Sequence, residues 1–157
     1  MKHLVCYVLC AVSTYNSCCA DVTKLAAEDR RALENTLRFQ EAHSTSDLPP
    51  QIVALCVGNN GKMADPGQRW NATDSIVDPS LPGKRLIWAA VDGEYYVVHY
   101  ERGGIAHTFH VLVSQFTKDG ITAKPIWRAI GGPFKDYAAF IVALRGGKLD
   151  DRMDYMH

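Results

Sequence analysis

Four apolar runs between residues 85 and 130 constrain the fold of this chain more than any other feature of its sequence. Short segments containing glycine separate the runs, at 92–93, 102–104 and 119–120. Glycine and aspartate tolerate the positive φ angles that tight hairpin turns require. The pattern therefore predicts an antiparallel meander with strands at 85–91, 94–101, 105–117 and 121–130. Pro125 cannot donate a ladder hydrogen bond, which places the last strand at an edge or at a bulge.

The register of this meander follows if the first turn has two residues and the second has three. Trp88 then lies opposite Val97, and Val97 lies opposite Phe109. Alternate residues share a face, so one face is strongly apolar and forms a core. Its residues are Leu86, Trp88, Ala90, Tyr95, Val97, His99, Ile105, His107, Phe109, Val111 and Val113.

The opposite face of the predicted sheet is also too apolar to be left wholly in water. It includes Tyr96, Val98, Leu112 and Phe116. We predict that a helix or a second copy of the chain covers it. Without a helix there, an isologous homodimer is the simplest closed arrangement.

Two further segments precede the meander. An apolar stripe containing Leu25, Leu33 and Leu37 predicts a helix over residues 22–43. Residues 51–57 are apolar without helical spacing and follow two prolines, so we expect a short strand there. Residues 58–84 have little periodicity and predict a long loop, a type of segment that often carries function when it is ordered.

The C-terminal part of the chain predicts a second helix. Gly131, Gly132 and Pro133 break the last strand, and Tyr137, Phe140, Ile141 and Leu144 then recur at helical spacing until Gly146. The charged tail from residue 148 onward is expected to fray. The whole pattern indicates an α+β fold: a four- to five-stranded antiparallel meander with an N-terminal helix and a C-terminal helix.

Residues 1–20 have the pattern of a secretory signal peptide, with a basic start, an apolar run over 4–12 and a small, polar end. The apolar run is too short for a stable membrane-spanning helix. We therefore expect export to the periplasm and a single domain over residues 21–157. In the alternative, Cys18 or Cys19 is the lipidated first residue of a lipoprotein, but neither has the aliphatic residue three positions upstream that such signals favour.

Charged side chains balance in this sequence, with 17 Lys and Arg against 17 Asp and Glu. There is no basic stripe interleaved with aromatic residues, which argues against a nucleic acid as the main partner. Paired glycines at 103–104 and 131–132 are spaced for turns rather than for a pyrophosphate, so no nucleotide cofactor is expected. Cys56 is the single cysteine after residue 20, so the exported domain has no internal disulfide.

The predicted register brings His99 and His107 face to face, with Glu101 nearby. Two imidazoles and a carboxylate can carry out acid/base chemistry or bind zinc. A pocket between sheet and helix, lined by Trp88, Tyr95, His99, Glu101, His107 and Phe109, would then hold a small molecule. A one-residue change of register separates the two histidines. We therefore favour structural histidines at the rim of the sheet, and we predict no metal site and no cofactor.

The long loop carries the better candidates for binding a protein. Met63, Arg69 and Trp70 lie there with Asp74, and Trp and Arg are residue types that anchor protein interfaces. Arg102, at the rim of the sheet, is a further candidate. In a second interpretation Trp70 folds back as a lid on the core.

Residues 95–113, followed by Pro133 to Phe140, resemble small periplasmic immunity proteins of Xanthomonas-like bacteria. These proteins block a co-encoded antibacterial effector that a type IV secretion system delivers. The resemblance implies a cone-like α+β fold of the cystatin or nuclear-transport-factor type. It also implies a non-enzymatic role, the inhibition of an effector such as a cell-wall hydrolase by direct binding. The predicted C-terminal helix departs from the usual order of elements in such a cone.

Overall fold

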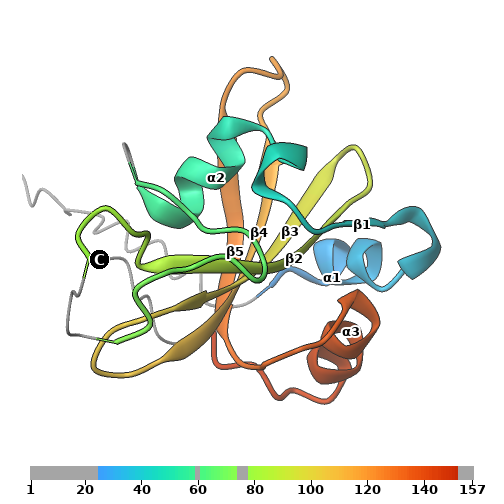
Figure 1. The fold of residues 1–157 in the computed structure, drawn as a ribbon. Coiled ribbons are helices and arrows are strands. Elements are labelled where there is room, and N and C mark those ends of the chain that lie inside the picture. Colours follow the sequence, from blue (N-terminus) through green and yellow to red (C-terminus); the bar gives the residue numbers. More distant parts are fainter. Residues whose placement is uncertain (1–24, 59–60, 74–77, 152–157) are drawn as a thin grey trace, which may run out of the picture.

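The computed structural model describes residues 25–58, 61–73 and 78–151 (Figure 1). The strands are β1 (Gln40–Ala42), β2 (Lys84–Val91), β3 (Tyr95–Arg102), β4 (Thr108–Phe116) and β5 (Ala123–Ile130). The α-helices are α1 (Ala27–Leu33), α2 (Pro50–Val57) and α3 (Tyr137–Arg145), and two short 3-10 helices are η1 (Thr36–Arg38) and η2 (Thr45–Asp47). The predicted signal peptide at 1–20, with Cys18 and Cys19, lies outside the described residues.

The strands form one antiparallel sheet whose spatial order follows the sequence from β1 to β5. Strands β2 to β5 are the predicted meander, and together with the helices they confirm the α+β class. Pro125 lies on the edge strand β5 and pairs with Ser114 beside a shift in the register of β4 and β5. The edge position removes the need for a ladder donor at Pro125.

The prediction of one helix over residues 22–43 is wrong. Helix α1 ends at Leu33, and the chain continues through η1 into β1, which pairs with β2. This pairing supplies hydrogen-bond partners along an edge of β2 that would otherwise be open, and it overrides the helical pattern of the sequence. Leu37, a member of the expected apolar stripe, is 97% exposed.

The β2–β3 turn and the β3–β4 loop are both longer than predicted, and this changes both registers. Val97 lies opposite Ala90 and Val113, and His99 lies opposite Trp88 and Val111. Each predicted pairing is therefore wrong. The errors are an even number of residues, however, so most side chains keep the face that the sequence predicts.

The first face of the sheet packs against α1 and α3. Its buried side chains include Trp88, Val97, Val111 and Val113, together with Leu33 and Phe140 from the helices. Two members of the predicted face lie elsewhere. A register shift between Leu86 and Trp88 turns Leu86 to the opposite face, and Ile105 is 94% exposed in the β3–β4 loop.

Helix α2 covers the second face, on the opposite side of the sheet from α3 (Figure 1). The prediction of a strand at 51–57 is wrong, because Pro50 occupies the first turn of a helix, where a missing N–H costs nothing. Ile52 and Cys56 are one helical turn apart and both face the sheet. The helix ends at Gly58, whose φ of 80° suits glycine.

Val98 and Leu112 are fully buried in the second core cluster, which also contains Ile52 and Cys56 of α2. The second face is therefore not open to water, and the reason given above for a homodimer does not hold. Self-association stays a prediction without an exposed sheet face to support it.

The C-terminal segment after α3 returns to the sheet. Ile130 and Asp150 exchange two main-chain hydrogen bonds of 2.8 Å. Up to residue 151 the tail is therefore bonded to β5, which corrects the expectation that it frays from residue 148. Within the described residues, no helix has both the length and the apolar character needed to span a bilayer.

Replacing Ile52 with alanine should lower the free energy of unfolding by about 2–5 kcal/mol, because the truncation leaves a cavity between α2 and the sheet. Chemical denaturation measures this change. Gln51 is exposed on the same helix, so Gln51→Ala serves as the control and should change stability by less than about 0.5 kcal/mol. Equally small effects for both variants would contradict the placement of α2.

Candidate functional site

The segment 61–73 lies against the end of β2 through main-chain hydrogen bonds. The N–H of Ala64 donates to the carbonyl of Lys84 at 3.0 Å, and the carbonyl of Ala64 accepts from the N–H of Leu86 at 2.9 Å. This parallel bridge fixes the start of the segment that the sequence predicts as a long loop. The loop therefore has a defined position over one end of the sheet.

The far end of the same segment reaches the β3–β4 loop. Thr73 forms a parallel bridge with Gly104. Next to it, the backbone of Gly103 lies so close to the carbonyl of Asn71 that a Cβ atom at position 103 would collide with it. Glycine is needed here because the two loops are in direct backbone contact.

A buried carboxylate lies where these loops meet the sheet. Glu101 is 5% exposed. It accepts a hydrogen bond from Nε of Arg85, its partner across the ladder, at 2.5 Å and one from Nε2 of His107 at 2.7 Å. The contact with Arg85 is an ion pair, and the contact with His107 is one when the imidazole is protonated. Charge-assisted hydrogen bonds of this kind are stronger than neutral ones.

Trp70 covers this group from the loop side. Its ring centroid lies 5.5 Å from that of His107, and the guanidinium carbon of Arg85 lies 5.1 Å from the Trp70 centroid. Trp70 is half-buried. Its ring packs on an ion-pair network rather than on the apolar core, which does not fit the interpretation of Trp70 as a lid on that core. Trp70, Arg85, Glu101 and His107 are referred to below as the Glu101 cluster.

The other residues predicted to bind a protein are separated in space. Met63 is buried in the core cluster beneath α2 and is not part of the surface. Arg69 is exposed beside Trp70, whereas Arg102 lines a cavity on the α2 side of the sheet. Asp74 lies outside the described residues.

The six residues predicted to line a sheet–helix pocket do not converge on one cavity. Trp88 and Tyr95 are packed in the first core cluster. Nε1 of Trp88 donates to the carbonyl of Phe134 at 2.8 Å. Phe109 lies opposite Glu101, next to the β3–β4 loop, and His107 lies in that loop, just before the first residue of β4. The predicted pairing of His99 with His107 is wrong because the β3–β4 loop is longer than three residues.

His99 has both ring nitrogens occupied inside the protein. Nδ1–H donates to the carbonyl of His110 at 2.9 Å, and Nε2 accepts from the N–H of Phe134 at 3.1 Å. Burial lowers the pKa of His99 to about 4, although the hydrogen bond to His110 and the charge of Glu101 act in the opposite direction. His99 is thus a neutral, structural histidine at pH 7.

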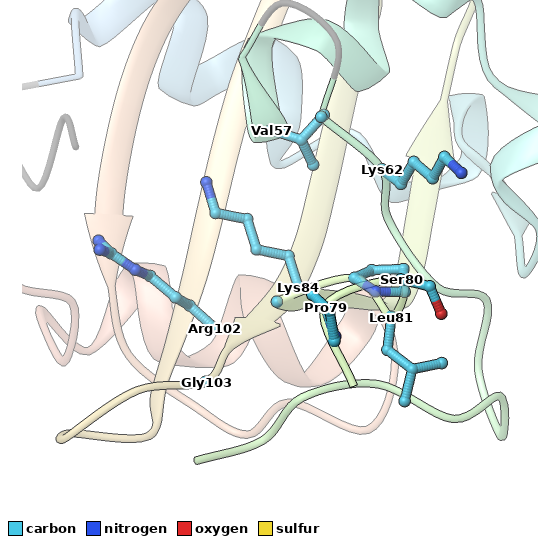
Figure 2. A pocket seen from close by; sticks show the side chains of 11 residues that line it. Val57, Lys62, Pro79, Ser80, Leu81, Lys84, Arg102 and Gly103 are labelled. Atoms are coloured by element: carbon cyan, nitrogen blue, oxygen red, sulfur yellow. The ribbon is translucent and has the colours of Figure 1, made fainter. Parts of the chain in front are cut away.

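A second polar feature lies on the α2 side, at the same end of the sheet (Figure 2). It is a surface cavity of about 550 Å³ whose cationic residues are Lys62, Lys84 and Arg102. The remaining lining residues are Val57, Gly61, Pro79, Ser80, Leu81, Pro82, Gly83 and Gly103. The sequence did not single out Lys84, because only the strand register reveals that it lies beside Arg102.

Arg85 was also missed by reasoning from the sequence. It is the cross-strand partner of Glu101, and opposite charges near the two ends of a hairpin are a detectable pattern once the turn is placed correctly. In the part of the chain that the structure describes, no three or more His, Cys, Asp or Glu side chains are grouped to hold a metal ion.

Comparisons with family models, with curated proteins and with solved structures found no match to this chain.

Acidification should destabilise the fold between about pH 6.5 and pH 4. In this range His99 is protonated in the unfolded chain and neutral in the folded chain. The stability that neutral His99 contributes is complete above its ordinary pKa of 6.5 and is lost as the pH falls towards 4. The loss from His99 should approach about 1.4 kcal/mol per pH unit at most. Burial also lowers the pKa of His110 to about 4, which adds to the effect.

Urea midpoints measured across this pH range provide the test. His99→Gln should flatten the pH dependence, whereas His43→Gln, at an exposed position, should keep the slope of the unmodified protein. Parallel curves for the two variants would show that His99 does not titrate in this way.

Glu101→Gln should lower the free energy of unfolding by about 1–3 kcal/mol, because it removes the charge that Arg85 and His107 share while keeping the shape of the side chain. Glu94→Gln, at an exposed position on the turn before β3, is the matched control and should have little effect. Calorimetry or denaturant unfolding measures both. An unchanged stability in Glu101→Gln would mean that the cluster contributes nothing to the fold.

Proposed function

We propose that this protein binds and inhibits a partner protein, and that it recognises the partner with the outer side of the Glu101 cluster. The recognition residues are Arg69, Trp70, Ile105 and His107, referred to below as the rim surface. The observation that carries the proposal is the exposure of Ile105, which reaches 94% in a loop held against a second, ordered loop. A large apolar side chain in such a position is available for burial against another protein.

The chemistry of the rim surface supports binding to a protein. Trp and Arg are the residue types most often found among interface residues that contribute strongly to affinity. The ring of Trp70 is already held by Arg85 and His107, so little conformational entropy is lost when a partner packs on it. A preorganised aromatic ring in contact with His107, two residues along the chain from the exposed Ile105, offers a partner both an aromatic and an aliphatic contact.

The partner class follows from the resemblance described above. Residues 95–113, which resemble periplasmic immunity proteins, contribute Ile105 and His107 to the rim surface. We infer that the protein is exported and masks the active site of a co-encoded antibacterial effector such as a cell-wall hydrolase. A stable complex of this kind buries about 1,200–2,000 Å² in total.

The alternative of an acid/base enzyme receives no support from the arrangement of its candidate residues. His99, the imidazole on which it depended, is buried, and its two nitrogens are hydrogen-bonded within the protein. A catalytic base must be within hydrogen-bond reach of its substrate. His107 does reach the surface, with its Nε2 bound to Glu101, but it does not share a cavity with the other residues predicted to line the pocket.

The proposal predicts that an open reading frame next to this gene encodes a secreted hydrolase, and that hydrolase is the partner to test. The two purified proteins should co-elute in size-exclusion chromatography, and the inhibitor should lower the rate at which the hydrolase digests peptidoglycan. Separate elution at micromolar concentrations together with undiminished hydrolase activity would contradict the proposal.

Ile105→Asp should weaken this complex by at least about 2 kcal/mol, the scale of a dominant interface residue, and leave the melting temperature nearly unchanged because the side chain is exposed. Ile121→Asp is the matched control: Ile121 is 69% exposed in the β4–β5 turn, at the opposite end of the meander. Titration calorimetry measures both affinities. Equal affinities for the two variants would remove the rim surface from the interface.

A further inference from the structure

Two cations face each other across the β2–β3 ladder. Lys84 and Arg102 are register partners, and both lie on the face that α2 covers. Figure 2 shows their side chains extending in the same direction from neighbouring strands. Like charges in directly opposed positions destabilise a sheet. We therefore expect one of two things: a negatively charged partner for these cations within the protein, or a function that uses two cations without such a partner.

The described residues contain little compensation. Among them, no carboxylate oxygen lies within 4.0 Å of a charged nitrogen of Lys62, Lys84, Arg102 or Arg128. Asp78, which is close to the cavity along the chain, accepts hydrogen bonds from the N–H and hydroxyl of Ser80. It closes its own turn and does not neutralise the cations.

The C-terminal end of α2 offers only partial negative charge. Nζ of Lys84 donates to the carbonyl of Cys56 at 2.5 Å, and Arg128 donates to the carbonyl of Leu55 at 3.0 Å. A helix C-terminus is equivalent to about half a negative charge. This is smaller than the total positive charge of Lys84, Arg102 and Arg128. Burial lowers the pKa of Lys84, and the charges of Arg102 and Arg128 lower it further.

Arg102 has no such role in the fold. Within the described part of the chain, its guanidinium makes no ion pair and no hydrogen bond, although it lines the cavity beside Lys84. Its five N–H donors are free to bind an oxyanion in a bidentate manner. Lys84 is bonded to one carbonyl and has two further donors, so both groups are available to the same ligand.

We propose that this cavity binds a small molecule carrying a phosphate group, with the phosphate between Lys84 and Arg102. A dianion matches the two neighbouring cations, Lys84 and Arg102, better than a single carboxylate does. The volume of about 550 Å³ lies within the range of small-molecule sites and is far larger than a phosphate ion. Val57, Leu81 and Pro82 supply apolar contacts for the organic part of the ligand, so the structure favours a phosphate monoester.

Titration calorimetry with ribose 5-phosphate, inorganic phosphate and unphosphorylated ribose tests this proposal at constant ionic strength. Ribose 5-phosphate should bind with a one-to-one stoichiometry and a dissociation constant of about 1 mM or lower, and ribose should not bind. Equal affinity for inorganic phosphate would support the phosphate site and identify the free ion as its ligand. Absence of saturable binding by both phosphates would overturn the proposal.

Variants locate the site. Arg102→Gln should weaken phosphate binding by about tenfold or more, because it removes a charge-assisted, bidentate contact. Lys118→Gln removes the same charge from the exposed β4–β5 turn and should leave the affinity unchanged. Lys84→Gln should also weaken binding, with the melting temperature recorded because Lys84 additionally caps α2. Undiminished affinity in Arg102→Gln would overturn the assignment.

This site is independent of the proposed inhibitory function. Ile105→Asp, which should disrupt the protein complex, should leave phosphate binding unchanged. Conversely, Arg102→Gln, which should weaken phosphate binding, should leave the affinity for the partner protein unchanged. The failure of either proposal is therefore recognised without reference to the other.

Discussion

Burial of both faces of the central β3–β4 hairpin is the constraint on which the other elements depend. Val97 and Val111 require a cover on one side, and Val98 and Leu112 require one on the other. The helices that provide these covers have 7 to 9 residues. Helices of this length are not stable alone in water. Sheet and helices therefore form together. The resulting three-layer arrangement fixes the points at which each loop begins and ends.

Much of the architecture was predictable because turns and strand alternation are local properties. The turn residues marked β2 to β5, and the helical spacing from Tyr137 to Leu144 marked α3. Helix α2 was not predictable, since a short apolar run does not distinguish a buried strand from a buried helix. Strand β1 was missed because three mostly polar residues gain their conformation from pairing with β2, which no local pattern records.

Some residues of the candidate site could be predicted from the sequence, but most of the contacts between them could not. Glu101 and His107 were both identified from the sequence, and the structure brings them into contact. Their association with Trp70 depends on how a long loop returns to the sheet, and that path is set by main-chain bonds rather than by side-chain pattern. Lys84 escaped notice for a related reason: its importance is a property of register, which turn lengths determine.

Gly103 limits the access of water to the ion pairs of Glu101 at this end of the molecule. Its missing side chain lets the loop around Asn71 lie directly on the backbone that follows β3. A single methyl group there would lift the loop and with it Trp70, so solvent would reach the carboxylate of Glu101. The effective dielectric around its ion pairs would then rise towards that of bulk water, and their attraction would fall several-fold. The strength of the electrostatic network is thus controlled by a residue that carries no charge and makes no contact with it.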